Sequence, residues 1–237
     1  MDLTQKLQDY TPDADAIEMV KSARIALLVG IAGAGKDTIK HELLKSDEFR
    51  DIVSHTTRAP RENNGVPEVD GREYHFIDIE SALKLVEQKA FVEVKAVHGD
   101  TLYGTSVAEI RAGQDEGKIS ITDIDVQGVG EYKQYSQNVV ALFILPPSYD
   151  TWRERLARRY QTTDEFEAEW PKRRGSAIKE LEFALSVPYY HFIINDDLQR
   201  SVRIAGQIAR KPDGFRREDD EARLVARDIL EELKSRV

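Results

Sequence analysis

The most informative segment of the chain is Gly30-Ile31-Ala32-Gly33-Ala34-Gly35-Lys36-Asp37-Thr38. It follows an apolar run over residues 25–29 and precedes a helix-like segment over residues 39–44, which predicts a strand, a tight turn and the start of a helix. Glycine permits the backbone angles at which successive N–H groups turn inward around phosphate oxygens. The helix N-terminus adds a partial positive charge and Lys36 adds a full one, so the pattern is typical of a triphosphate-binding loop. The alternative is a glycine-rich strand-to-helix turn that binds no ligand.

The position after the lysine departs from the usual pattern, in which a Ser or Thr hydroxyl binds Mg²⁺. Asp37 occupies this position, and Thr38 follows it. A carboxylate would hold a hydrated magnesium ion, or the hydroxyl of Thr38 would substitute, and the sequence leaves both alternatives open. The carboxylate would also repel a triphosphate.

The composition limits the classes of function. At 237 residues the chain can bury a full core, as one domain with lobes or as two domains. Lysine and arginine number 34 against 43 aspartates and glutamates, a net charge of -9, which argues against a general nucleic-acid or anionic-membrane surface. A phosphate site must therefore be a local basic cluster. The absence of cysteine excludes disulfides and thiolate metal sites.

The sequence predicts neither a membrane span nor a secretory signal. No apolar run approaches the ~20 residues of a membrane span, and residues 1–10 lack a basic start followed by an apolar stretch. We therefore expect a soluble, cytoplasmic protein with no membrane or nucleic-acid partner.

Apolar runs separated by helical segments indicate a parallel sheet covered on both faces, with core strands over residues 24–29, 119–124, 139–145 and 192–194. The phosphate loop leads into a helix expected over residues 36–45. Between these core elements lies a small β-rich insertion, about residues 53–104, with a loop-like stretch at 60–73 and strand-like pieces at 74–77 and 90–97. A helix is expected over residues 107–114.

The remaining segments are mostly helical. Residues 151–185 are rich in arginine, but 161–171 are acidic and lose periodicity, which suits an exposed, mobile flap. Residues 1–22 resemble a polar helical preamble interrupted at Pro12. Apolar residues of the tail, 221–237, form one stripe of an amphipathic helix, which either docks on its own core or makes a subunit contact.

A second cluster of charge lies at residues 54–61, where Arg58 and Arg61 stand three residues apart beside hydroxyls. A guanidinium group forms bidentate bonds to phosphate, and two of them can hold one dianion. Surface arginine pairs are common, so this pair by itself is weak evidence for a phosphate site. Farther along the chain come, in order, residues 70–76, 91–93, 102–105, 123–128 and 195–198, which read DGREYHF, FVE, LYGT, DIDVQG and NDDL.

With the phosphate loop first, this set resembles guanylate kinase, the enzyme that moves a phosphate from ATP to GMP. The similarity covers about residues 23–205. It implies an α/β fold, a P-loop three-layer sandwich with a central parallel sheet, a β-rich GMP-binding insertion and a helical lid. The implied boundaries are an N-terminal helical extension (1–22), a kinase domain (23–210) and a C-terminal helical extension (211–237). Within the kinase domain, the core is 23–52, 106–156 and 175–210, the GMP-binding lobe 53–105 and the lid 157–174.

The resemblance also implies roles for individual residues. The implied ATP-binding set is Gly30, Ala32, Gly33, Ala34, Gly35, Lys36, Asp37, Thr38 and Asn195. The implied GMP-binding set is Ser54, Arg58, Arg61, Tyr74, Glu93, Tyr103, Thr105 and Asp125. Within that set, the residues implied to bind the phosphate are Arg58, Arg61, Tyr74 and Tyr103. Those implied to surround the base are Ser54, Glu93 and Thr105. The implied catalytic residues are Lys36, Arg58 and the lid arginines Arg159 and Arg173, with Arg174 as an alternative to Arg173. Mg²⁺ is the expected cofactor, near Asp37 and Thr38.

The chemistry of guanine supports the assignment of Glu93. Guanine presents two adjacent donors, the ring N–H and the exocyclic amino group, and one carboxylate accepts both, whereas it would face an acceptor on adenine. The alternative is an ordinary solvated carboxylate on a strand. Asp123 and Asp125 end a predicted parallel strand, where open α/β sheets bind ligands, although an aspartate there also caps the next helix.

These observations predict ATP- and Mg²⁺-dependent conversion of GMP, and of dGMP, to the diphosphate by in-line phosphoryl transfer, in a monomer or homodimer. One rival is a non-catalytic guanylate-kinase-like domain that binds proteins, but such domains typically have degraded phosphate loops. Another rival is a related kinase for a different phosphorylated acceptor.

Overall fold

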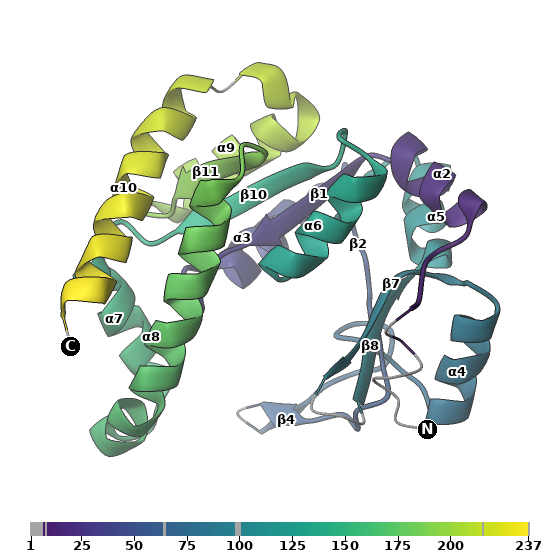
Figure 1. The fold of residues 1–237 in the computed structure, drawn as a ribbon, viewed down its shortest axis with the longest axis horizontal. Helices are drawn as coiled ribbons and strands as arrows, with labels where there is room; N and C mark the ends of the chain where they lie inside the picture. Colours follow the sequence, from purple (N-terminus) through teal and green to yellow (C-terminus); the bar gives the residue numbers. More distant parts are fainter. Residues whose placement is uncertain (1–6, 8, 64, 98–100, 215, 237) are drawn as a thin grey trace. The chain divides into compact units, whose positions relative to one another are not determined.

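The computed structural model describes residues 7, 9–63, 65–97, 101–214 and 216–236, so most of the first eight residues of the expected preamble lie outside it. The chain divides into two compact units, and each is described by itself. Unit 1 comprises the described residues up to 25, together with 48–122 and 130–139. Unit 2 comprises residues 26–47, 123–129 and the described residues from 140 onward. Element labels follow Figure 1.

Unit 2 contains parallel strands in the order β11-β10-β1, with bounds Tyr190–Ile194, Val140–Leu145 and Ile25–Val29. Every residue of β1 and β10 is buried, as a parallel sheet packed on both faces requires. Its helices are α3 (Lys36–Leu43), α7 (Tyr149–Ala157), α8 (Thr163–Ser186), α9 (Leu198–Arg210) and α10 (Arg216–Ser235), with a 3₁₀ turn at Pro212–Gly214. Helix α9 packs on α3 and α10 packs on α8, and both α9 and α10 contact β11 (Figure 1).

Unit 1 contains β2 (Phe49–Asp51), which pairs in parallel with β9 (Ile119–Asp123). It also contains a four-stranded mixed sheet in the order β6-β3-β8-β7, with bounds His75–Phe76, His55–Thr56, Thr101–Ser106 and Phe91–Val97. Strands β4 (Glu62–Asn63) and β5 (Val66–Pro67) form a short hairpin. The helices are α2 (Ala14–Ser22), α4 (Ile79–Glu87) and α5 (Val107–Asp115), and α6 (Val126–Tyr135) follows β9 along the chain.

The predicted fold class is confirmed, since parallel apolar strands alternate with helices and a β-rich insertion interrupts them. The tail forms a helix whose apolar stripe, Ala222, Ala226, Ile229 and Leu233, is buried against its own chain. Docking on its own core was therefore the correct alternative for this helix. The lobe and lid boundaries stay a prediction.

Residues 161–171 are mostly exposed, as expected of the flap, but from Thr163 onward they are helical in spite of the lost periodicity. They begin α8, whose N-cap Thr162 and third residue Glu165 form a reciprocal capping box. The helix continues through Pro171, which lacks the N–H that would bond the carbonyl four residues earlier. Phe166 is the one fully buried side chain of this stretch. A mostly exposed helix has no apolar stripe, so its period is invisible in the sequence.

The expected break at Pro12 is also found. Helix α2 begins at Ala14, and the Asp13 carboxylate accepts a hydrogen bond of 2.8 Å from the backbone N–H of Ala16 as its N-cap. Among the residues that the structure describes, no helix is both long enough and apolar enough to cross a bilayer.

Candidate active site

The glycine-rich loop joins β1 to α3 as predicted, and its backbone explains the glycines. Gly30, Gly33 and Gly35 have φ angles of 152°, 86° and 94°, a region that side chains disfavour. A Cβ atom on Gly30 would collide with the carbonyl oxygen of Ile144 in β10, and one on Gly35 would collide with the side-chain amide of Asn195. The loop is therefore tightly enclosed by its neighbours and not a loose connection.

Two buried side chains hold the carbonyl groups of this loop. The indole Nε1 of Trp152 donates to the oxygen of Ala32 at 2.7 Å, and the amide of Asn195 donates to the oxygen of Ala34 at 2.9 Å. The N–H of Ala34 donates to the carbonyl of Ile31 within the loop at 3.0 Å, so it is not one of the N–H groups left for a ligand. Asn195, expected beside the donor nucleotide, thus supports the loop. Trp152 was not predicted, because its spacing in α7 suggests only an ordinary core residue.

Lys36, Asp37 and Thr38 form the first turn of α3. The ammonium group of Lys36 lies 3.5 Å from the nearer carboxylate oxygen of Asp37, whose side chain is half exposed, and Thr38 is exposed. One helical turn later, Lys40 forms an ion pair of 3.0 Å with Asp123 at the end of β9. Partial burial would raise the pKa of Asp123, but the charges of Lys40 and Lys36 outweigh it and lower that pKa. This end of the helix therefore combines two cations with two carboxylates.

Glu180 in α8 is a further residue of this region that the sequence did not indicate. Burial raises its pKa to about 7, the charge of Lys36 opposes this increase, and the charge of Asp125 adds to it. Glu180 therefore lies within electrostatic range of the lysine of the loop. Nothing in the helical spacing of α8 distinguishes it from its solvated neighbours.

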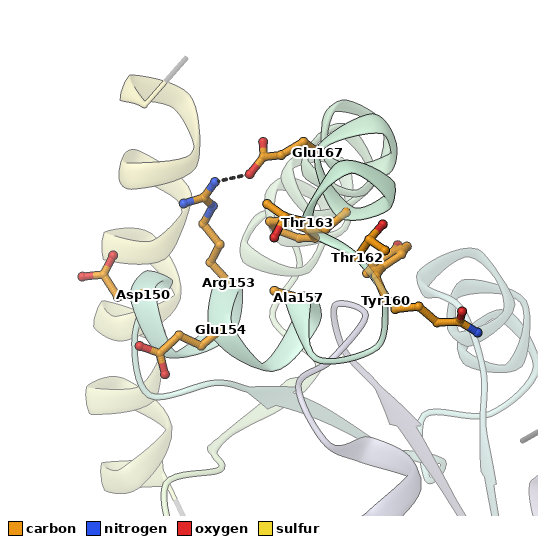
Figure 2. Close-up of a pocket in the computed structure, with 10 residues that line it drawn as sticks. Asp150, Arg153, Glu154, Ala157, Tyr160, Thr162, Thr163 and Glu167 are labelled. Carbon is orange, nitrogen blue, oxygen red and sulfur yellow. Dashed lines mark hydrogen bonds and ion pairs between the residues drawn. The ribbon is translucent and has the colours of Figure 1, made fainter.

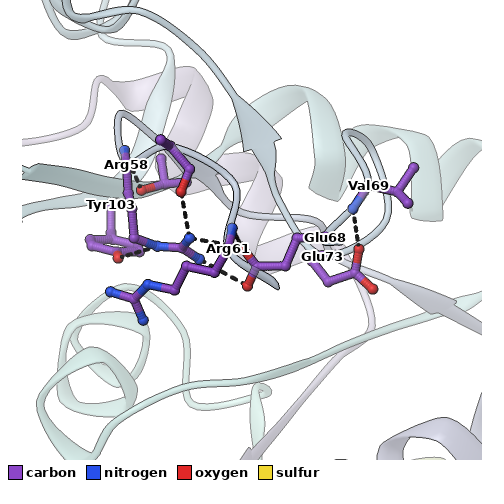
Figure 3. A network of polar contacts seen from close by, with 8 residues as sticks. Arg58, Arg61, Glu68, Val69, Glu73 and Tyr103 are labelled. Atoms are coloured by element: carbon purple, nitrogen blue, oxygen red, sulfur yellow. Dashed lines mark hydrogen bonds and ion pairs between the residues drawn. The ribbon is translucent and has the colours of Figure 1, made fainter. Parts of the chain in front are cut away.

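The acceptor-side residues centre on Arg58, whose guanidinium is almost fully engaged (Figure 3). Its Nε donates to the hydroxyl of Tyr103 at 3.1 Å, and one terminal nitrogen donates to the carbonyl of Ala59 at 2.7 Å. Both terminal nitrogens donate to the carboxylate of Glu68, at 2.7 and 3.1 Å. Of the five N–H bonds of an arginine, one is left without an acceptor among the described residues.

Glu68 also accepts the backbone N–H of Arg61 at 2.7 Å, so one carboxylate fixes both arginine positions. The pKa of Arg58 is raised by its hydrogen bonds to Glu68, and the pKa of Glu68 is lowered by the same contact. The ring of Tyr74 lies 5.3 Å from the Arg58 guanidinium and packs edge-on against Tyr103. Three predicted residues thus form one cluster with Glu68, which the sequence did not reveal. A loop contact across ten residues leaves no periodic signal.

The predicted base-binding residues also lie together in unit 1. Thr105 in β8 is buried, and its hydroxyl lies 3.2 Å from that of Ser54. Glu93 in β7 is the cross-strand partner of Thr105. Opposed residues on antiparallel strands have side chains about 5 Å apart at Cβ, so Glu93 lies beside Thr105, whose hydroxyl is next to that of Ser54.

Asp125, the remaining residue of the predicted GMP-binding set, belongs to unit 2. Its carboxylate accepts the backbone N–H of Gly128 at 2.6 Å and so caps the first turn of α6. The helix-cap alternative therefore accounts for part of the role of Asp125.

The arginines predicted to belong to the lid differ in their contacts. Arg159 lies exposed in the turn between α7 and α8, and Arg173 donates through Nε to the hydroxyl of Tyr160 at 3.0 Å. Arg174 instead donates to the carbonyl oxygens of Leu233 and Lys234 in α10, at 2.6 and 3.5 Å. Arg174 is therefore engaged in holding the C-terminal helix, which favours Arg173 as the lid residue.

A hollow between α7 and the start of α8 lies beside this turn (Figure 2). Its wall includes Tyr160, Phe166 and an exposed ion pair of 2.8 Å between Arg153 and Glu167. None of the predicted ATP- or GMP-binding residues lines it. The predicted site therefore does not coincide with this hollow.

Comparison with known proteins supplies the deciding observation. Residues 22–209 match the family model described as guanylate kinase. The chain belongs to the guanylate kinase family. It is 38% identical over 176 residues to "Guanylate kinase 1" of Oryza sativa subsp. japonica, a match that covers 73% of this chain and 44% of the rice protein. It is also 38% identical over 182 residues to "Guanylate kinase" of Nitratidesulfovibrio vulgaris, covering 76% and 83%.

A crystal structure of guanylate kinase from Anaplasma phagocytophilum has the same fold. The TM-score is 0.58 at 26% sequence identity, and the match covers 87% of this chain and 98% of that one. The chain spans less than half the length of the rice relative, but more than four fifths of the Nitratidesulfovibrio one. As a guanylate kinase family member, the chain is a nucleotide kinase, and its residue-level roles follow as proposals.

Proposed function

We propose that the chain transfers the γ-phosphoryl group of ATP to GMP, giving ADP and GDP. The observation that carries the proposal is the pairing of Glu93 with Thr105 beside Ser54 in unit 1, because this polar site matches the two adjacent donors of guanine. We propose dGMP as a second acceptor, since the assigned residues contact the phosphate and the base and none is assigned to the ribose 2′-hydroxyl.

The acceptor phosphate binds to the cluster around Arg58. Four N–H groups of the Arg58 guanidinium donate to Tyr103, Ala59 and Glu68, which fix its orientation and leave one N–H for the phosphate. The exposed side chain of Arg61 supplies the bidentate contact, because the Glu68 carboxylate holds its backbone and leaves its guanidinium available.

The donor triphosphate binds to the loop N–H groups and Lys36. Phosphoryl transfer needs alignment, exclusion of water and positive charge around the moving group, with little covalent help from the protein. Lys36 supplies charge from the helix N-terminus, and Arg159 and Arg173 supply it from the lid. Arg173 exchanges its hydrogen bond with Tyr160 for the phosphoryl oxygens when the lid closes.

Magnesium fits the residues at the start of α3. The described residues contain no cluster of three or more metal-ligating side chains, but Mg²⁺ keeps several waters and needs only one or two carboxylates beside the phosphates. Asp37, half exposed in the first turn of α3, would provide that carboxylate, and the hydroxyl of the exposed residue Thr38 would contact a bound water. When bound, the ion neutralises phosphate charge.

A coupled assay of ADP release tests the proposal with GMP, dGMP, AMP, UMP, CMP and ribose 1,5-bisphosphate as acceptors. We expect turnover with GMP and dGMP, little with the other acceptors, and loss of turnover when EDTA removes divalent ions. Equal rates with AMP and GMP would refute the base assignment, and the absence of any ADP release would favour a protein-binding role.

Glu68→Gln is expected to raise the KM for GMP about tenfold, because hydrogen bonds to charged groups contribute about 1.5–3 kcal/mol and this change weakens those that orient Arg58. The KM for ATP should stay unchanged. Glu73→Gln is the matched control, since Glu73 likewise accepts a backbone N–H in this loop, that of Val69 at 2.7 Å, but its side chain pairs with Arg72 and not with Arg58. Steady-state kinetics over both substrates provide the measurement. Equal KM values for GMP in the two variants would contradict the role of Glu68.

A further inference from the structure

The segment that precedes α2 packs against the acceptor-side sheet of unit 1, although the family match begins only at residue 22. Leu7 is buried in one cluster with Ala82, Phe91, Val94 and Leu102. Tyr10 packs against the same cluster, and Figure 1 shows this segment in purple passing β7. A segment outside the family's matched range is therefore part of the core that supports the base-binding strand.

Strand β7 has two features that make it dependent on support. It is the edge strand of its sheet, so one row of its backbone groups has no partner among the described strands. Its pairing with β8 also shifts between Phe91 and Glu93, because Phe91 pairs with Ser106 and Glu93 with Thr105. Two steps along β7 thus correspond to one step along β8, which is a β-bulge, a device that re-aims the side chains beside it.

Tyr10 satisfies both open backbone groups at this bulge. Its hydroxyl donates to the carbonyl oxygen of Phe91 at 2.7 Å and accepts the N–H of Phe91 at 3.1 Å. One hydroxyl thus replaces the missing strand partner at the residue where the register shifts. Burial raises the pKa of Tyr10 to about 12, which is consistent with a hydroxyl that keeps its proton for this bond.

Lys89 holds Tyr10 in turn. Its ammonium group lies 5.1 Å from the centre of the Tyr10 ring and donates to the carbonyl of Thr11 at 2.8 Å. Lys89 has a φ of 55°, in the left-handed region, in the turn that leads from α4 into β7. Lys89 thus links the turn that enters β7 to the segment that contains Tyr10 and Thr11.

We propose that Tyr10 is a positioning residue for Glu93, which fixes the bulge and thereby aims the carboxylate at guanine; this rests on the proposed function. Without the hydroxyl, the N–H and carbonyl groups of Phe91 form hydrogen bonds with water instead. The pairing register of β7 is then no longer fixed at the bulge. A slip of one residue turns every side chain of a strand to the other face, so a small population of slipped or loosened strands removes Glu93 from the base. Nucleotide selectivity is then set partly by a residue outside the family match.

Tyr10→Phe tests this proposal, because it keeps the ring and removes only the hydroxyl. We expect the KM for GMP to rise about tenfold, since two hydrogen bonds are lost, while the KM for ATP stays within about twofold. Inosine monophosphate lacks the exocyclic amino group. The preference for GMP over this nucleotide should fall by about the same factor, because the Glu93 carboxylate no longer faces that group. Tyr135→Phe is the matched control, because Tyr10 and Tyr135 line the same groove beside β7.

A second variant keeps the test decisive if Tyr10→Phe folds poorly. Lys89→Met keeps the side-chain stem and removes the charge above the Tyr10 ring, so we expect the same shifts at about twofold. If the wild-type chain turns over GMP and every folded variant matches Tyr135→Phe in its KM for GMP and in its GMP preference, the role of Tyr10 alone is overturned. A wild-type chain without GMP turnover would instead overturn the proposed function.

Discussion

Lys36→Ala is expected to lower kcat by at least about a hundredfold and to leave turnover close to background. A preorganised charge at the transferring phosphoryl group stabilises the transition state, and removal of one such group typically costs about 10²–10³ in kcat. The loss is enhanced here because Asp37, 3.5 Å from the ammonium group, would face the triphosphate without its neighbouring cation. Steady-state turnover of ADP with saturating GMP provides the measurement.

Lys45→Ala is the control for this change. Lys45 lies just after α3, is exposed and pairs with Glu42 at 2.6 Å, so its removal alters the net charge equally without touching the loop. Calorimetry should show that Lys36→Ala still binds GMP, because the acceptor residues of unit 1 are intact. A kcat within about tenfold of wild type would contradict the role of Lys36.

Glu93→Ala is expected to lower kcat/KM for GMP by about a hundredfold or more and to remove most of the preference for GMP over AMP. Guanine would lose the acceptor for both of its donors, and a site built to pair polar groups rejects ligands that leave them unpaired. Most of the change should appear in the KM for GMP, because the carboxylate contacts the base and not the moving phosphate. The measurement is the ratio of kcat/KM for GMP and AMP.

Glu131→Ala serves as the matched control for Glu93. Glu131 lines the groove beside β7 and pairs with Lys95 at 3.2 Å, but it is not among the residues assigned to the base. Its removal should leave the GMP-to-AMP ratio unchanged. If the ratio of kcat/KM for GMP and AMP is unchanged in Glu93→Ala, groups other than Glu93 determine the base selectivity.

Much of this architecture was predictable because short-range patterns encode it. The glycines before Lys36 specify a turn that only they tolerate, and the apolar runs at β1 and β10 specify buried parallel strands. The same reasoning does not predict the helical structure of residues 163–171, where an exposed helix continues through Pro171 without a buried face to give it a period.

The contacts that the sequence did not reveal join residues far apart in the chain or in loops. Trp152 reaches the carbonyl of Ala32 across 120 residues, and Tyr10 reaches Phe91 across 81. Glu68 is only ten residues from Arg58, but it lies in a loop without a repeating pattern. Local propensity carries no information on such pairs, since they exist only after the chain has folded.

Helix α10 has a practical consequence for anyone who trims this chain to its homologous region. The family match ends at residue 209, before the helix whose carbonyl oxygens receive Arg174 and whose Arg223 donates to the carbonyls of Val187 and Tyr190. A chain that ends at residue 209 would uncover the side of α8 on which α10 packs and would leave Arg174 without its acceptors. A fragment that is meant to keep these contacts must therefore extend through α10.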